Sequence, residues 1–176
     1  MTDEKKLPQR KTMRAKYFDY SSTGAYFLTI CTKDKKHILS RIVGTGVLDR
    51  PQKGVFDSPK IILKHCGKIV EKYINQLNDF YENITVNEYV IMPNHIHIIV
   101  SVVRDGPSGT PVPTVLNSTV SKFISTFKRF VNKEVGENIF QRSFYDRIIR
   151  NNGEYMEICN YIRLNPDNWE MDELYC

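Results

Sequence analysis

The residues best suited to chemistry by type and spacing are His95 and His97, which lie inside an apolar, β-branched run. In a β-strand alternate side chains point to the same face, so the two imidazoles would lie side by side, roughly 6 to 7 Å apart along the backbone. Ile96 and Ile98 would face the core and fix the register, because a slip of one residue would bury both histidines. Such a pair can chelate one divalent metal ion. The alternative is a pair of surface histidines or of histidines satisfied by hydrogen bonds.

Tyr161 and Asn165 are four residues apart in a segment with helical periodicity, so their side chains share one helical face. Tyr161 would offer a phenolate nucleophile that forms a covalent intermediate, and the side-chain oxygen of Asn165 would be a third metal ligand. A phenol with a pKa of about 10 is mostly protonated at neutral pH, so a metal and basic surroundings must assist it. The alternative is a packing role, because the chain has ten tyrosines. Tyr145 and Tyr155 are the other candidate nucleophiles.

Imidazoles suit several divalent metals, and a nuclease-type ion such as Mg²⁺ or Mn²⁺, the cofactor we expect, would also need an oxygen ligand and retained waters. We assign no role to His37, in the expected insertion, or to His65, at a helix start. The four cysteines are scattered and form no CxxC pair, which argues against a zinc ribbon or finger.

The elements that must position these residues follow from hydrophobic periodicity. Two β-rich runs, 84–92 and 95–103, are separated only by Pro93 and Asn94, which predicts a hairpin of antiparallel strands. The other expected elements are a first strand over 25–32, a helix over 61–81, a helix over 119–135, a strand over 139–150 and a last helix over 153–165 that Pro166 ends. This order predicts an α+β fold, a ferredoxin-like βαββαβ antiparallel sheet with an additional C-terminal helix that carries the nucleophile.

Composition divides the chain into one folded domain and two polar ends. Residues 1–22 are basic and poor in apolar side chains, which predicts a mobile arm. Residues 23–168 form the expected nuclease domain, with an insertion over 33–60 and a loop over 104–116. Residues 169–176 form an acidic tail, for which a solvated end is favoured over a segment that covers the site or mimics DNA.

The charge of this 176-residue chain is uneven, and it favours a polyanionic partner. The net charge is +5, but only one of the 25 basic residues and six of the 20 acidic ones lie from Asn151 onward, so this end carries −5 and the rest carries +10. Such a balance is typical of nucleic-acid binding, although a solvated basic surface is the alternative. We find no apolar run of membrane-spanning length and no signal peptide, so we expect a cytoplasmic, nucleoid-associated protein with no membrane partner.

Basic side chains on the expected helix 119–135, on the strand 139–150 and in the arm are the candidates for binding the DNA backbone, with a solvated surface charge as the alternative for each. They are Lys122, Lys128, Arg129, Arg142, Arg147, Arg150, Arg14 and Lys16.

The segment EYVIMPNHIHIIV, residues 88–100, resembles the histidine-hydrophobe-histidine strand of HUH single-strand DNA transposases, specifically the REP-associated tyrosine transposases. Three further blocks are similar to this family in the same order: GAYFLTICT from Gly24, FQRSFYDRIIRN from Phe140 and YIRLNPDNW from Tyr161. The sequence departs from the family at Phe140, where tryptophan is common, and in its short acidic tail. The resemblance spans nearly the whole chain.

The resemblance implies that His95, His97 and Asn165 hold a divalent ion and that Tyr161 is the nucleophile. Tyr161 would attack a phosphodiester of single-stranded or hairpin DNA, giving a 5′-phosphotyrosine link and a free 3′ hydroxyl that later reverses the step. The bond energy is conserved, so no ATP is required. The implied enzyme nicks and rejoins DNA at hairpin-forming repeats, as a monomer or a homodimer.

Two other functions fit the same residues. A ferredoxin-like sheet with aromatic and basic residues also binds single-stranded nucleic acid without cleaving it. A mononuclear metal hydrolase would use His95 and His97 to activate water and would form no covalent intermediate. A protein–DNA adduct that survives denaturation separates the transposase from both.

Overall fold

The structure is a computed structural model that describes residues 24–44, 59–103 and 119–175. The predicted arm with Arg14 and Lys16, the middle of the insertion and the loop 104–116 lie outside these residues. The elements in chain order are β1 (Gly24–Cys31), the 3-10 turn η1 (Lys33–Lys35), β2 (Ser40–Val43), β3 (Lys60–Leu63), α1 (His65–Phe80), β4 (Ile84–Ile91), β5 (His95–Val102), α2 (Thr119–Val135), β6 (Tyr145–Ile149), α3 (Asn152–Leu164) and the 3-10 turn η3 (Trp169–Met171).

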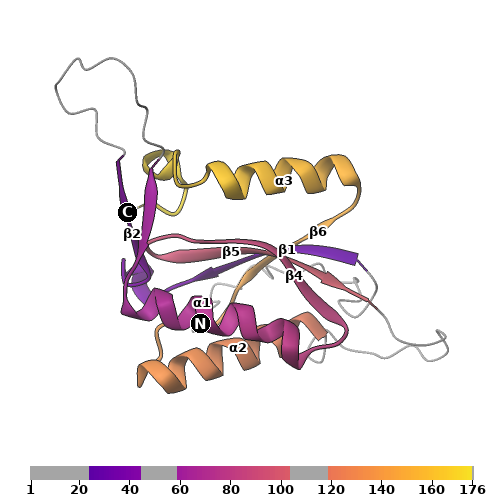
Figure 1. The fold of residues 1–176 in the computed structure, drawn as a ribbon, viewed down its shortest axis with the longest axis horizontal. Helices are drawn as coiled ribbons and strands as arrows, with labels where there is room; N and C mark the ends of the chain where they lie inside the picture. Colours follow the sequence, from indigo (N-terminus) through magenta and orange to yellow (C-terminus); the bar gives the residue numbers. More distant parts are fainter. Residues whose placement is uncertain (1–23, 45–58, 104–118, 176) are drawn as a thin grey trace, which may run out of the picture.

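The main sheet has the strand order β4-β5-β1-β6, and each neighbouring pair is antiparallel. With α1 and α2 as the crossovers this is the predicted ferredoxin-like βαββαβ core, and α3 is the predicted additional helix. Figure 1 shows α1 and α2 on one face of the sheet and α3 on the other. The fold prediction is therefore confirmed.

Alternation along the central strands assigns the histidines to the α3 face. Leu28 of β1 and Ile96 and Ile98 of β5 are fully buried in the cluster that packs against α1 and α2. Because successive side chains in a strand point to opposite faces, His95 and His97 point toward α3. The register places Thr29 opposite His97 and Cys31 opposite His95.

A second apolar cluster packs beneath α3 and fixes the rotation of that helix. Ile158 and Ile162 are buried against Ile99 of β5 and Ile149 of β6. The helix starts at the N-cap Asn151, whose side chain accepts a hydrogen bond from Glu154 N at 2.8 Å. Because the apolar side chains of α3 face the sheet, its other side chains lie at the surface of the molecule.

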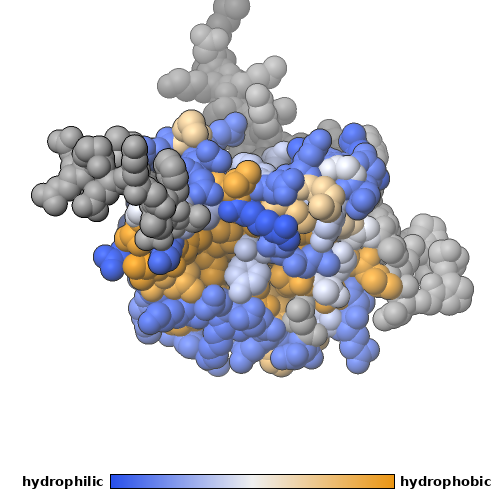
Figure 2. Space-filling view, turned by 45° about the horizontal axis from the view of Figure 1, so that its top comes forward, coloured by the Kyte–Doolittle hydropathy of each residue, from blue (hydrophilic) through white to orange (hydrophobic). Residues whose placement is uncertain are grey.

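The distribution of apolar residues over the surface agrees with this layered arrangement. In Figure 2, apolar residues gather in a band with hydrophilic residues above and below it. Across the described parts of the chain, the helices are all too short or too polar to cross a membrane.

Two sequence-based boundaries were wrong. Residues 61–63 belong to strand β3 and not to the first helix, because they pair with Arg41, Ile42 and Ser40 of β2 in a small antiparallel sheet. The last strand of the core starts at Tyr145 and not at 139, and only Phe140 in the preceding segment forms a bridge, to Thr32. Both differences arise from pairing with distant segments, which local periodicity does not report.

Gly67 in α1 lets the segment before β2 dock beside the turn that leads to His95. A Cβ atom at Gly67 would lie 2.0 Å from the carbonyl oxygen of Leu39. Leu39 N donates in turn to Pro93 O at 3.0 Å, and Ser40 Oγ donates to Ile91 O at 2.8 Å. The close approach of α1 therefore supports the hairpin that carries the histidines.

We predict that Gly67→Ala lowers the free energy of unfolding by about 1 to 3 kcal/mol, because the methyl group forces α1 away from backbone atoms. Without this contact, alanine would stabilise the helix by about 1 kcal/mol. Urea unfolding measures the change. Lys68→Ala, at the next and exposed position, is the control and should change stability by less than about 0.5 kcal/mol. A Gly67→Ala protein more stable than the wild type would contradict the packing argument.

Candidate active site

The hairpin strand β5 and the end of α3 bring together the four residues expected to form the site. The rings of His95 and His97 lie 4.5 Å apart between centroids. Tyr161 Oη lies 3.3 Å from His97 Nε2. Asn165 follows α3 in helical conformation, one turn after Tyr161. His95, His97 and Asn165 are 0%, 4% and 2% exposed, so three polar side chains are buried in one place.

Each imidazole is oriented by a hydrogen bond to its Nδ1 atom. Asn94 Oδ1 accepts from His95 Nδ1 at 2.8 Å, and Thr29 Oγ1 lies 2.9 Å from His97 Nδ1. These contacts turn the Nε2 atom of each ring toward the site, where His97 Nε2 faces the Tyr161 hydroxyl, as in metal sites where a second residue fixes the tautomer of the histidine. Sequence reasoning missed both residues. Identifying Thr29 would have required the register between β1 and β5, which the sequence does not give.

We predict that Thr29→Val weakens Mn²⁺ binding by about 10-fold, because His97 loses the partner that orients its ring. The substitution keeps the shape of the side chain and the buried strand. Titration of the protein with Mn²⁺, followed by electron paramagnetic resonance, measures the dissociation constant. Thr85→Val on the exposed side of β4 is the matched control and should leave it unchanged. Equal affinities of the two variants would show that Thr29 does not position the ligand.

The electrostatics of the buried rings favour their neutral forms. Burial lowers the pKa of His95 to about 4, and the nearby Asp172 carboxylate opposes this shift only in part. Burial, and then the neighbouring His95, hold the pKa of His97 well below its usual value. Both imidazoles are therefore uncharged at neutral pH and present lone pairs, which is the state that a metal ion requires.

Two buried atoms at this site have no hydrogen-bond partner among the described residues, His95 Nε2 and Asn165 Oδ1. An unsatisfied buried polar atom costs about 1 to 3 kcal/mol, so proteins rarely leave two side by side. Two imidazole nitrogens and an amide oxygen are a donor set that suits a divalent transition-type ion. The residues present therefore fit a metal ion, and His95, His97 and Asn165 are the ones that would hold it.

Asp172, which sequence reasoning did not single out, lies at the centre of this group. Its Oδ2 atom accepts from Asn165 Nδ2 at 2.8 Å, and lies 3.4 Å from Tyr161 Oη and 4.0 Å from His95 Nε2. The donor atoms of His95, His97 and Asp172 all lie within 4.8 Å of one another. The tail therefore packs over the site, whereas the sequence favoured a solvated end.

The signal that could have found this arrangement is the single tryptophan in the tail. Trp169 is buried, and its ring centroid lies 5.9 Å from that of His95 and 5.6 Å from that of His37. A solvated segment does not explain a large aromatic residue such as Trp169, three positions before Asp172.

Tyr161 is half-exposed, so a substrate can reach its hydroxyl while its ring stays packed. The ring lies edge-on to Phe27 and to His97, at centroid distances of 6.1 and 5.3 Å. Burial, and then the Asp172 carboxylate, raise the pKa of Tyr161 to about 12. The hydroxyl is therefore protonated at neutral pH, and forming the phenolate requires added positive charge at the site.

Tyr161 borders a cleft of about 480 Å³ between β1, the segment before β6 and the tail. Tyr145 also borders it, whereas Tyr155 packs against the apolar cluster beneath α3. Lining residues are Phe27, Thr29, Cys31, Lys35, His97, Gln141, Ser143, Phe144, Tyr145, Tyr161, Asp172, Glu173 and Leu174. The cleft combines aromatic side chains with polar ones, as sites for unpaired bases do.

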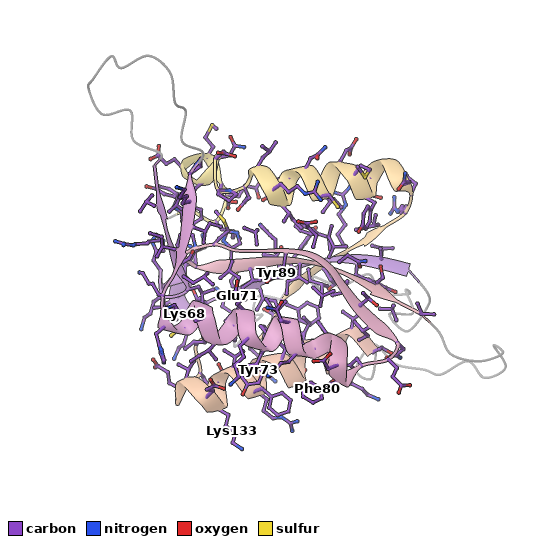
Figure 3. The ribbon with its side chains drawn as sticks, in the orientation of Figure 1. Lys68, Glu71, Tyr73, Phe80, Tyr89 and Lys133 are labelled. Atoms are coloured by element: carbon purple, nitrogen blue, oxygen red, sulfur yellow. The ribbon has the colours of Figure 1, made fainter. Side chains whose placement is uncertain are left out.

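The basic residues expected to bind DNA are spread over both sides of the molecule. Lys122 and Arg129 are exposed on α2, across the sheet from α3 (Figure 1). Figure 3 shows Lys133 of the same helix projecting away from the sheet. Arg142 and Arg150 are exposed, one before β6 and the other directly after it.

Two of the expected DNA-binding residues have contacts within the protein. Lys128 Nζ donates to the carbonyl oxygens of Gln141 and Ser143 at 2.8 and 2.9 Å. Arg147 forms an ion pair with Glu154 at 2.6 Å. These contacts hold the segment before β6 against α2 and β6 against the start of α3.

Comparison with known proteins agrees with this fold. The family described as Transposase IS200 like matches residues 55–165, more than half of the chain, and the matched region contains both histidines, Tyr161 and Asn165. The chain belongs to the IS200-like transposase family. The resemblance seen in the sequence is therefore confirmed at the level of the family.

Two individual relatives extend this result. An uncharacterized protein of Haemophilus influenzae is 28% identical over 184 residues, which cover 96% of this chain and 94% of the relative. The solved structure of a REP-associated tyrosine transposase bound to a REP hairpin is similar with a TM-score of 0.57 at 17% identity, and the match covers 91% of this chain and 77% of that chain. The second likeness shows that the fold is shared.

Proposed function

We propose that this transposase is a metal-dependent enzyme that nicks and rejoins single-stranded DNA through a 5′-phosphotyrosine intermediate at Tyr161. The observation that carries the proposal is the position of Tyr161 Oη, 3.3 Å from the Nε2 atom of the buried His97. Beside it lie His95 Nε2 and Asn165 Oδ1, two buried atoms without a hydrogen-bond partner among the described residues. A nucleophile next to a set of metal donors suits metal-assisted cleavage of a phosphodiester.

His95, His97 and Asn165 would hold Mg²⁺ or Mn²⁺, and the two nitrogen donors favour Mn²⁺ because Mg²⁺ prefers an all-oxygen shell. When bound, the ion would neutralise charge on the scissile phosphate and fix its orientation. Its charge would also oppose the effects of burial and of the Asp172 carboxylate, which raise the pKa of Tyr161. The buried hydrogen bonds of Thr29 and Asn94 keep the imidazoles in place without rearrangement.

Tyr161 Oη then attacks the phosphorus, a new phosphotyrosine bond forms and the bond from phosphorus to the 3′ oxygen breaks. The phenolic proton leaves through the exposed edge of the site, and the departing 3′ oxygen takes up a proton from water. Attack by a 3′ hydroxyl on the phosphotyrosine reverses the step and restores Tyr161. Packing of the tyrosine ring against Phe27 and His97 holds the hydroxyl near attack distance.

The proposed substrate is hairpin DNA of the REP-associated kind. The solved relative is described as bound to a REP hairpin, and the four sequence blocks of this chain resemble that subgroup. Arg142 and Arg150 are the better-placed candidates for backbone contacts, because Lys128 and Arg147 have internal partners. Histidines and tyrosine come from one chain, which supports a site assembled within a monomer.

The test is the covalent intermediate itself. Incubating the protein with a labelled single-stranded hairpin and Mn²⁺, then denaturing it, should leave a labelled protein–DNA adduct and a cleaved strand with a free 3′ hydroxyl. Peptide mapping by mass spectrometry should place the nucleotide on Tyr161. Cleavage without an adduct would instead indicate a metal hydrolase. Binding without cleavage would indicate a binding module.

A further inference from the structure

The acidic tail places one carboxylate, that of Asp172, within 4.8 Å of the ligand atoms of both histidines of the proposed centre. The Asp172 side chain is only 2% exposed, although the tail lies at the surface. Its Oδ2 atom contacts the Asn165 amide and approaches the Tyr161 hydroxyl and the His95 ring. A buried carboxylate is costly unless a positive charge compensates it.

No basic side chain in the described part of the chain forms an ion pair with Asp172 other than His95, at 4.0 Å. The hydrogen-bond partners of the carboxylate are the Asn165 amide, the Tyr161 hydroxyl and the backbone of Leu174, which carry no formal charge. Among the described residues, Asp172 is therefore held by neutral hydrogen-bonding groups.

The carboxylate is held in this position by the fold of the tail. Asp172 Oδ1 accepts from Leu174 N at 2.7 Å, which closes a tight turn. Asn94 Nδ2 donates to Leu174 O at 2.8 Å while Asn94 Oδ1 accepts from His95. One side chain therefore orients both a metal-binding imidazole and the segment that delivers Asp172, and Trp169 packs on the same imidazole.

We propose that Asp172 is a fourth protein ligand of the ion held by His95, His97 and Asn165. The inference rests on the proposed function, because it assumes that an ion binds there. Two donors that bind one ion at about 2.1 Å each lie no more than about 4.2 Å apart, and His95 Nε2 and Asp172 Oδ2 are 4.0 Å apart. Asp172 would supply the one negative charge in a set of otherwise neutral donors.

In the opposite role, the Asp172 carboxylate would fill the site and compete with the ion. This role predicts the opposite change in the dissociation constant when the carboxylate is removed. A ligand strengthens binding, so its removal raises the dissociation constant. A competitor weakens binding, so its removal lowers the constant. Direct metal binding without DNA therefore decides between the two.

The experiment measures Mn²⁺ binding to the full chain by electron paramagnetic resonance titration. Asp172→Asn keeps the shape and the acceptor oxygen but removes the charge, and it should raise the dissociation constant at least 10-fold. Glu170→Gln, an exposed residue of the same tail with the same change of charge, is the control and should stay within about twofold. An unchanged or lower constant for Asp172→Asn would overturn the proposal.

Stability without metal provides a check against misfolding. Asp172→Asn removes a buried charge whose hydrogen-bond partners are neutral, so the metal-free variant should melt at the same temperature as the wild type or higher. Its stabilisation by added Mn²⁺ should be smaller than that of the wild type. A variant that melts at a lower temperature without metal would overturn the charge argument.

A third variant separates this inference from the proposed function. If His97→Ala loses Mn²⁺ binding and Asp172→Asn keeps it, only the role of Asp172 is rejected. If the wild type does not bind Mn²⁺, the metal centre and the role of Asp172 are both rejected.

Discussion

Replacing Tyr161 by phenylalanine should abolish the covalent adduct and lower single-turnover cleavage of a hairpin strand by at least about 10⁴-fold. The change removes only the attacking oxygen. The ring keeps its edge-on contacts with Phe27 and His97, so the fold and the metal donors should be retained. Quenched time courses with labelled DNA measure the rate, and Mn²⁺ titration should give an affinity within about threefold of the wild type.

Tyr145→Phe is the matched control, because Tyr145 borders the same cleft and is similarly exposed. We expect it to retain the adduct and most of the cleavage rate. An adduct that persists in Tyr161→Phe and disappears in Tyr145→Phe would transfer the role of nucleophile to Tyr145.

His97→Ala should raise the dissociation constant for Mn²⁺ at least 100-fold and lower cleavage accordingly. The substitution removes one of two nitrogen donors, and it leaves Thr29 Oγ1 without its partner in the buried strand. In the wild type, Mn²⁺ at 100 times its dissociation constant should add about 2.7 kcal/mol to the free energy of unfolding. Urea unfolding with and without Mn²⁺ should show this increment in the wild type and not in the variant.

His65→Ala is the control for this prediction, because His65 is exposed at the start of α1. It should bind Mn²⁺ as the wild type does and show the same stabilisation. Full stabilisation of His97→Ala by Mn²⁺ would mean that the ion binds elsewhere on the protein.

The parts of the site that the sequence predicted are those governed by local periodicity. Two-residue alternation placed His95 and His97 on one face of a strand, and the helical repeat placed Tyr161 and Asn165 on one face of a helix. Neither pattern states how the strand and the helix meet. Their meeting depends on the apolar residues beneath α3, such as Ile158 and Ile162, which turn Tyr161 toward the histidines.

The residues that sequence reasoning missed act through contacts between distant segments. Thr29 depends on the register of β1 against β5, and Asp172 depends on Trp169 and Asn94, which anchor the tail. The same limit affects charges: Lys128 and Arg147 are basic like any DNA-binding residue, but the folded chain gives them internal partners. Spacing alone does not separate a structural cation from one that contacts DNA.

One chain supplies both imidazoles and the Tyr161 hydroxyl, which lies 3.3 Å from His97 Nε2. On the proposed chemistry, a single molecule can thus make one attack, and it then carries one strand end until a 3′ hydroxyl returns. Moving a DNA segment requires breaking the strand at both of its borders. Excision would therefore need either two molecules acting together or two successive cycles of the same molecule. The excision rate should depend on the square of the enzyme concentration in the first case and on its first power in the second.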